Sequence, residues 1–152
     1  MSSGETSLTR TTKIAYSRWG RKPYFIAAAG TFYGITAYLT LFKQATSLSD
    51  FKKKWAAHCK EFPETGNGGG FLVLPDSDER GRHFLTFEAG RVPLMDEWAP
   101  FYAEGSGRAF AMGAMAVANT TAIDAVRIAA RFDNYTSAPL EWISTDGVLH
   151  RI

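Results

Sequence analysis

The first hydrophobic signals along the chain predict a β-hairpin that leads into a long helix. Apolar and polar residues alternate from Thr11 to Ser17, as in a half-buried strand, and Tyr24 to Ala29 forms a second short apolar run. The polar residues between the two runs predict a turn. After Gly30, apolar side chains recur at spacings of three and four from about Thr31 to Gln44, which indicates an amphipathic helix.

A second helix is predicted directly after the first. Ser49 is expected to cap a helix that begins near Asp50, because a serine hydroxyl accepts a hydrogen bond from the free N–H groups of a first turn. Phe51, Trp55 and Cys59 then recur every fourth residue, so they share one face. We expect that face to be buried.

The middle of the chain predicts a second hairpin. The glycine-rich stretch from Glu61 to Gly70 is typical of a flexible loop, and the runs Phe71–Leu74 and Arg82–Glu88 flank a polar turn. A short edge segment is expected from Arg91, and one more strand from Phe101 to Ala103. This region therefore predicts antiparallel sheet.

Two further helices are predicted in the last third. Gly105-Ser106-Gly107 opens a helix from Arg108 to about Val117 that consists largely of Ala, Met, Gly and Phe. A helix that is apolar on nearly every side is expected to be buried between layers. Thr121 and Asp124 have the spacing of a capping box, which predicts the start of the next helix.

The chain closes with two strand-like segments, Leu140–Ile143 and Val148–Ile152. The predicted order is thus two strands, two helices, several strands, two helices and two strands. Helix pairs that alternate with antiparallel hairpins suggest two packed sheets with helices outside. We expect a single α+β domain over residues 1–152.

Composition narrows the range of functions. A length of 152 residues with 45% hydrophobic residues suffices for one domain with a sizeable core. The net charge of +2 is too small to argue for nucleic acid or an anionic membrane surface. The single cysteine, Cys59, excludes an internal disulfide, and Met1–Arg10 lacks the apolar core of a secretory signal. We expect a cytoplasmic protein.

One stretch raises a membrane alternative. Pro23–Phe42 contains no charged residue and is about as long as a membrane span. Threonine, tyrosine and glycine residues interrupt it, and Gly30 divides it into a short apolar run and a helical pattern. A buried strand followed by a buried helix explains the stretch better than a span. We therefore expect no membrane contact, and the single membrane helix remains the alternative.

Few residues have the spacing of a known catalytic or metal-binding site. Cys59 follows His58, but adjacent side chains on a helix point in different directions and cannot form a nucleophile–base pair. A buried, inert thiol is the preferred interpretation. The histidines show no ligand spacing, so no metal and no cofactor are expected. Two further features are compatible either with a tight turn or with a functional site. They are the segment Gly105–Gly107, and Asp133 just past a helix end.

In combination, these segments resemble one family. Gly105-Ser106-Gly107, the small-residue helix, Ala125–Ala129 on the next helix and then Asp133–Thr136 resemble the second half of proteasome β-subunits and of the related bacterial HslV-type peptidase. Thr12-Lys13-Ile14, the hairpin, Ala28-Ala29-Gly30 and the long helix resemble their first half. Compact proteins of this kind also occur in tailed bacteriophages.

The resemblance implies a fold, a chemistry and a set of site residues. The fold would be the four-layer αββα sandwich of N-terminal-nucleophile hydrolases, and the activity a threonine-type peptidase in which the nucleophile's own α-amine is the base. Lys13 would lower the pKa of the reacting groups by its charge, and the backbone N–H of Ala29, where the family commonly has glycine, would stabilise the oxyanion. Ser106, Asp133 and Thr136 would support the α-amine.

The same resemblance leaves the activity open. It places the nucleophile and an aspartate partner on strands ahead of Met1, so the expected fold lacks its first strands and the nucleophile segment. Either translation starts at Met1 and the protein is a non-catalytic scaffold or assembly component, for example of a phage particle, or the true start lies upstream. In both cases we expect a ring-like homo-oligomer with a peptide or protein partner, in the host cytoplasm or a virion.

Overall fold

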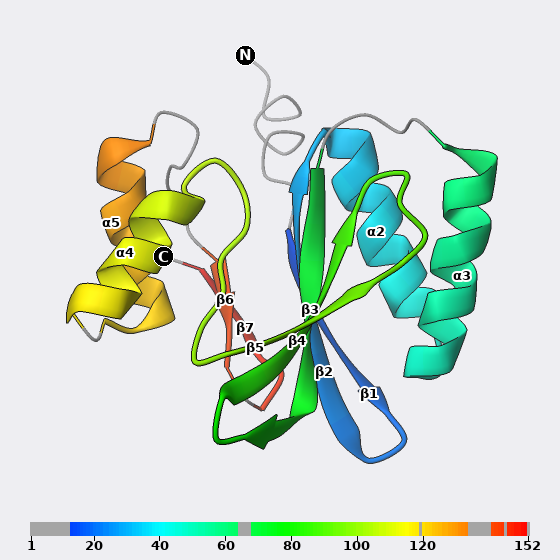
Figure 1. Cartoon of the computed structure of the whole chain (residues 1–152), viewed down its shortest axis with the longest axis horizontal. Coiled ribbons are helices and arrows are strands. Elements are labelled where there is room, and N and C mark those ends of the chain that lie inside the picture. Colours follow the sequence, from blue (N-terminus) through cyan, green and yellow to red (C-terminus); the bar gives the residue numbers. More distant parts are fainter. Residues whose placement is uncertain (1–12, 64–67, 119, 134–140, 145, 152) are drawn as a thin grey trace.

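The computed structural model describes residues 13–63, 68–118, 120–133, 141–144 and 146–151. Within them lie a five-stranded antiparallel sheet, a two-stranded sheet and four helices (Figure 1). The strands of the large sheet follow one another in chain order: β1 (Ile14–Trp19), β2 (Lys22–Gly30), β3 (Gly68–Asp78), β4 (Gly81–Glu88) and β5 (Met95–Ala99). The predicted α+β class is confirmed.

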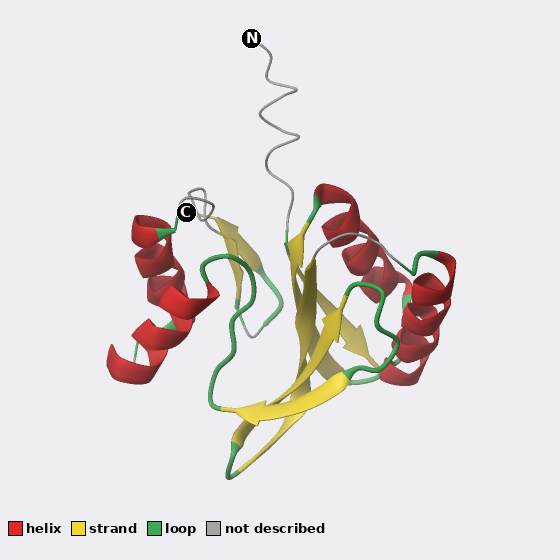
Figure 2. Cartoon of the chain, turned by 45° about the horizontal axis from the view of Figure 1, so that its top comes forward, coloured by secondary structure: helices red, strands yellow, loops and turns green. Residues whose placement is uncertain are grey.

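Helices cover one face of the large sheet, and the described elements after β5 lie on the other side. Helices α2 (Phe32–Gln44) and α3 (Leu48–Glu61) connect β2 to β3 and pack on one face. A hairpin of β6 (Glu141–Ile143) and β7 (Leu149–Arg151) lies beside the other face, with α4 (Arg108–Ala118) and α5 (Ala122–Phe132) beyond it (Figures 1 and 2).

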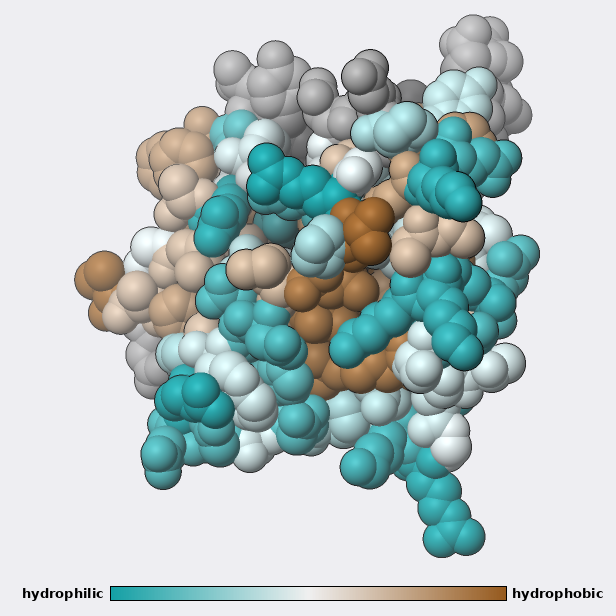
Figure 3. Space-filling model, turned by 45° about the vertical axis from the view of Figure 1, so that its right-hand side comes forward, coloured by the Kyte–Doolittle hydropathy of each residue, from teal (hydrophilic) through white to brown (hydrophobic). Residues whose placement is uncertain are grey.

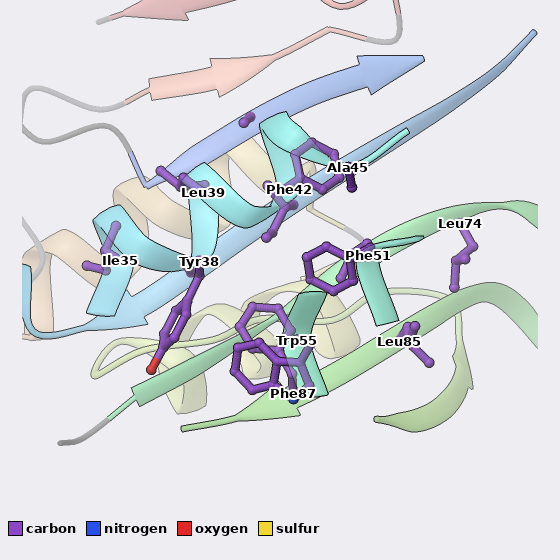
Figure 4. Packing of buried hydrophobic residues seen from close by; sticks show 14 of the residues in the cluster. Ile35, Tyr38, Leu39, Phe42, Ala45, Phe51, Trp55, Leu74, Leu85 and Phe87 are labelled. Atoms are coloured by element: carbon purple, nitrogen blue, oxygen red, sulfur yellow. The ribbon is translucent and has the colours of Figure 1, made fainter. Parts of the chain in front are cut away.

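Aromatic side chains fill the space between α2, α3 and the sheet. Tyr38 and Phe42 from α2 and Phe51 and Trp55 from α3 are all fully buried, and Phe87 of β4 meets them from the sheet (Figure 4). The rings of Trp55 and Phe87 lie 4.9 Å apart between centroids. This packing follows from the spacing of three and four that the sequence shows in both helices.

Most helix and hairpin predictions are confirmed. The Thr31 hydroxyl caps α2 by accepting from the Gly34 N–H at 3.1 Å, and the Thr121 hydroxyl caps α5 by accepting from the Asp124 N–H at 3.2 Å. Cys59 is buried, as its place on the apolar face of α3 predicts. Hydrophilic residues cover much of the face shown in Figure 3, and apolar surface gathers in a hollow at its centre.

The predicted cap of α3 is wrong by two residues. The helix begins at Leu48, and Ser47, rather than Ser49, accepts from the Asp50 N–H at 3.0 Å. The Asp50 carboxylate reaches back to the Thr46 N–H at 3.0 Å, so the first turn satisfies its free donors reciprocally. Ser47 has the right spacing for this exchange with Asp50 because it precedes that residue by three positions.

The glycines predicted as the end of a loop belong to a strand. Gly68, Gly69 and Gly70 open β3 and pair with β2, where Gly70 lies opposite Ala28. A Cβ on Gly70 would lie 2.1 Å from the Ala27 carbonyl oxygen and 2.7 Å from Cζ of Phe87. Glycine is therefore needed here for close approach of neighbouring strands.

The predicted strand at Phe101–Ala103 is absent, and the edge strand is β5, Met95–Ala99. Pro100 follows β5 and cannot donate to a further ladder. Tyr102 instead packs on the face of the sheet, with its ring 5.0 Å from Phe71 and 5.6 Å from Phe84. An apolar run thus covers the sheet rather than extending it.

The expectation that α4 is buried between layers is also wrong. Of its side chains described, Ala111 alone is buried, and Val117 is 89% exposed. The helix packs mainly against α5, through contacts of Ala111 with Ala125 and Ala129. The rings of Phe110 on α4 and Phe132 on α5 also stack, with centroids 5.6 Å apart, but both side chains stay partly exposed. The apolar composition of α4 therefore does not translate into burial.

The uncharged stretch Pro23–Phe42 is divided between β2 and α2. No helix among the described residues is long and apolar enough to cross a membrane.

The contrast between two glycines gives a test of the packing. Gly70→Ala is expected to lower the free energy of unfolding by about 2 kcal/mol or more, because its methyl group would overlap Ala27 and Phe87. Gly113→Ala is the matched control, since a Cβ at that helical position meets nothing within 4 Å, and it is expected to raise stability by roughly 0.5–1 kcal/mol. Equal effects in chemical denaturation would contradict this account.

Candidate functional site

The resemblance-based site begins where β1 and β2 meet. Lys13 precedes β1, and its carbonyl oxygen accepts a hydrogen bond from the Ala28 N–H at 2.8 Å. The backbone of Lys13 is therefore fixed next to the end of β2, one residue from Ala29. The Lys13 side chain is exposed, so its charge is available at this end of the sheet.

The turn before α4 reaches the same end of β2. Gly105 adopts a φ of 103°, and a Cβ built on it would lie 3.4 Å from the Cβ of Ala29. The Gly105 carbonyl accepts from the Arg108 N–H at 3.1 Å, which closes the turn into the helix. The left-handed conformation explains why glycine stands at this position, and the contact brings Ser106 close to Ala29 in space.

A hydrogen bond joins the start of α4 to the end of α5. The Ser106 hydroxyl donates to Oδ2 of Asp133 at 2.5 Å, across a sequence separation of 27 residues. Asp133 is the C-cap of α5, and its own N–H donates to the Ala129 carbonyl at 2.8 Å. Because α4 and α5 pack against each other, the first residues of one lie beside the last residues of the other.

Four of the five predicted site residues thus lie at connected positions. Ser106 and Asp133 are in direct contact, Gly105 adjoins Ala29, and the Lys13 backbone adjoins Ala28. The approach of the Lys13 ammonium to Ser106 and Asp133 stays a prediction. Thr136 lies outside the described residues.

A cavity of about 450 Å³ opens beside this group. Its wall includes Gly69, which pairs with Ala29 in the sheet, and Glu104, which precedes the Gly105 turn. It is further lined by Gly68, Thr86, Phe87, Glu88, Ala89, Arg91, Tyr102 and Arg108. Charges of both signs therefore face one space, and Ser106 stands in the chain between two of its lining residues, Glu104 and Arg108.

Tyr102 and Arg108 form the part of this wall that the sequence does not reveal. The Arg108 guanidinium lies 5.1 Å from the centre of the Tyr102 ring. Burial raises the pKa of Tyr102, and the carboxylates of Glu104, Glu97 and Glu88 raise it further, against the lowering effect of Arg108. The hydroxyl therefore stays protonated at neutral pH. The run Phe101–Ala103 has the pattern of a strand, so the sequence did not indicate that Tyr102 lines a cavity.

Other titratable groups have structural explanations. Burial raises the pKa of the Cys59 thiol, against a smaller effect of a backbone hydrogen bond with Gly90, so the reactive thiolate is disfavoured. Burial lowers the pKa of His58, which packs near Trp55.

No cluster of three or more possible metal-ligating side chains occurs in the described part of the chain.

Loss of the hydrogen bond between Ser106 and Asp133 gives a second prediction. Ser106→Ala is expected to lower the free energy of unfolding by about 1 kcal/mol, because the hydroxyl joins two helix ends across one hydrogen bond. Ser49→Ala, at an exposed position of α3, is the control and should change stability by no more than about 0.5 kcal/mol. If both variants unfold like the wild type in urea, this hydrogen bond does not hold the helices together.

No protein-family model matches the sequence, and no curated protein matches it either. The family interpretation of the group around Ser106 therefore remains a proposal, which rests on the order of motifs in the sequence and on the contacts described above.

Proposed function

We propose that this chain is a proteasome-like subunit of the N-terminal-nucleophile hydrolase fold, related to threonine-type peptidases. The order α2 and α3, large sheet, β6–β7 hairpin, α4 and α5 supports a four-layer αββα sandwich (Figure 2). The observation that carries the proposal is the contact of Ser106 with Asp133, because the resemblance assigns both residues to one site although they are far apart in sequence.

The resemblance gives each residue a role in peptide hydrolysis. A threonine hydroxyl attacks the peptide carbonyl while its own α-amine accepts the proton. Lys13 supplies a positive charge that lowers the pKa of the reacting groups, and the Ala29 N–H donates to the oxyanion. Ser106 and Asp133 hold the α-amine, and their mutual hydrogen bond already orients the Ser106 hydroxyl.

These matched positions form the supporting part of such a site, and none of them is the nucleophile. The proposal therefore separates into two measurable parts: a fold related to the peptidases, and peptide hydrolysis by this chain. A peptide substrate would occupy the space beside Gly105 and Ala29, next to the cavity that Glu104 and Arg108 line.

Hydrolysis of a fluorogenic peptide tests the catalytic part. Lys13→Ala is expected to reduce kcat/KM by about a hundredfold or more, because the site would lose the charge that activates the reacting groups. Lys22→Ala is the matched control, since Lys22 is also exposed and lies at the opposite end of the same hairpin, and it should leave the rate unchanged. Equal rates for both variants, or no turnover by the wild type, would count against a catalytic role.

A second candidate function is a scaffold or assembly subunit, for example of a phage particle. The observation in its favour is apolar surface on the α4–α5 pair, where Val117 is 89% exposed and the stacked rings of Phe110 and Phe132 are 42% and 64% exposed. Gly113 lies on α4 with open space above it. Apolar side chains that gather on an exposed helix pair are typical of a protein contact, and a ring-like homo-oligomer would cover them.

Light scattering after size-exclusion chromatography tests this second function. Val117→Lys is expected to shift an oligomer toward the monomer, because a buried contact would then enclose an unpaired charge. Val92→Lys is the matched control, since Val92 is 50% exposed and lies outside α4. A wild-type monomer at all concentrations, or an oligomer that Val117→Lys leaves intact, would contradict assembly through α4.

A further inference from the structure

His83 on β4 lies between two carboxylates from the neighbouring strands. Its Nδ1 is 2.9 Å from Oδ2 of Asp76 on β3, and its Nε2 is 2.6 Å from Oδ1 of Asp96 on β5. The His83 side chain is 15% exposed, whereas both carboxylates are more than half exposed. One imidazole ring therefore bridges three consecutive strands.

This geometry favours one charge state of the His83 ring. A neutral imidazole carries one N–H, so one of the two carboxylates would face a nitrogen lone pair. The imidazolium donates from both nitrogens and satisfies both partners. Burial lowers the pKa of His83, but the hydrogen bonds and charges of Asp96 and Asp76 outweigh burial and hold the pKa above its ordinary value of 6.5.

An aromatic stack adds to the ionic contacts. His83 and Trp98 are direct partners across β4 and β5, and their rings stack with centroids 4.1 Å apart and an interplanar angle of 7°. The guanidinium of Arg80 also lies over Trp98, 4.4 Å from the ring centroid. Trp98 therefore contacts two cationic side chains, an arrangement that favours the protonated form of His83.

The other charged groups described beside this cluster form an ion pair, and a neutral tyrosine lies near one of its carboxylates. Asp78 on β3 is paired with Arg80 in the turn, and its own pKa is lowered mainly by that hydrogen bond. Tyr24 on β2 faces Asp76, and its pKa is raised first by burial and then by that carboxylate. Arg80, which Asp78 neutralises, is thus the one other cation among these neighbours of His83.

We propose that protonated His83 is a clip that fastens the edge strand β5 to β3 and β4, and that loss of its proton releases β5. Within the described residues β5 pairs with β4 alone, so its attachment to the sheet depends on that one ladder and on contacts of its side chains. The strand leads directly into the segment that carries Tyr102 and Ser106. The clip does not depend on the peptidase proposal, because it concerns the sheet itself.

The direction of the pH effect follows from the raised pKa. Because His83 binds its proton more tightly in the folded protein than in the unfolded chain, the clip stabilises β5 fully below pH 6.5, the ordinary pKa. The stabilisation is lost as the pH rises through the pKa of the folded state. The strand should therefore open more readily in mildly alkaline solution, and high salt should weaken the effect because the carboxylates are exposed.

Two NMR measurements on the wild-type protein test the clip. Titration of the His83 ring should give a midpoint above 6.5, with both nitrogens protonated below it. Amide-exchange protection factors, which correct for the intrinsic rise of exchange with pH, should fall about threefold to tenfold in β5 across that midpoint. Amides of the central strand β2 serve as the internal reference and should keep their protection.

Two variants distinguish the proposed role of His83 from an effect that any histidine stacked on a tryptophan would have. Asp96→Asn should lower the His83 midpoint and remove most of the pH dependence of β5. His150→Gln is the matched control, because His150 also stacks on a tryptophan, Trp142, at 4.0 Å, but bonds through Nε2 to the Ser144 hydroxyl. It should leave β5 unchanged.

A His83 midpoint at or below 6.5, or β5 protection that is constant across the midpoint, would overturn the proposal. The wild-type titration decides the matter even if Asp96→Asn does not fold. A peptidase assay has no part in either readout, so the clip and the proposed function can fail separately.

Discussion

The structure depends on the aromatic layer that α2 and α3 place on one face of the large sheet. Tyr38, Phe51 and Trp55 are completely buried there, and each such side chain contributes roughly 1.5–3 kcal/mol by leaving water. Trp55 also donates from its indole nitrogen to the Arg91 carbonyl at 2.7 Å, so the core fixes the segment that follows β4. That segment contributes to the wall of the cavity beside Ser106, and the hydrophobic core thereby determines the shape of a polar site.

The opposite side of the sheet is held by smaller and more polar contacts. Ala125 and Ala129 bury the contact of α5 with α4, while the hydrogen bond of Ser106 with Asp133 joins the helix ends. The turn at Gly105 then meets Ala29 of β2. The candidate site thus lies where a weakly buried helix pair approaches the large sheet.

Charged side chains gather at two places in the structure. Beside Ser106, Glu104 and Arg108 face one cavity, and at the far end of β4 the His83 cation meets two carboxylates. The two places are connected through β5 and the segment that follows it. β4 takes part in both places, since it carries His83 near its start and Thr86, Phe87 and Glu88 of the cavity wall near its end.

Elements whose signal is local could be predicted from the amino-acid pattern. The spacing of apolar residues in α2 and α3, the cap at Thr121 and the alternation in the hairpins depend on neighbours within a few positions, and the α+β class follows from their order. The placement of Ser106, Asp133 and Ala29 near one another was expected from a family resemblance, and no local pattern contains it.

Tertiary structure alone decided the features that depend on distant contacts. Gly70 belongs to a strand because β2 and Phe87 approach it, Tyr102 covers the sheet because Pro100 ends β5, and α4 is exposed because little beyond α5 packs against it. The carboxylates around His83 come from two other strands, so no spacing in the sequence predicts that they lie near it. Local propensity acts over a few residues, whereas burial and charge pairing are set by whatever the fold brings within a few ångströms.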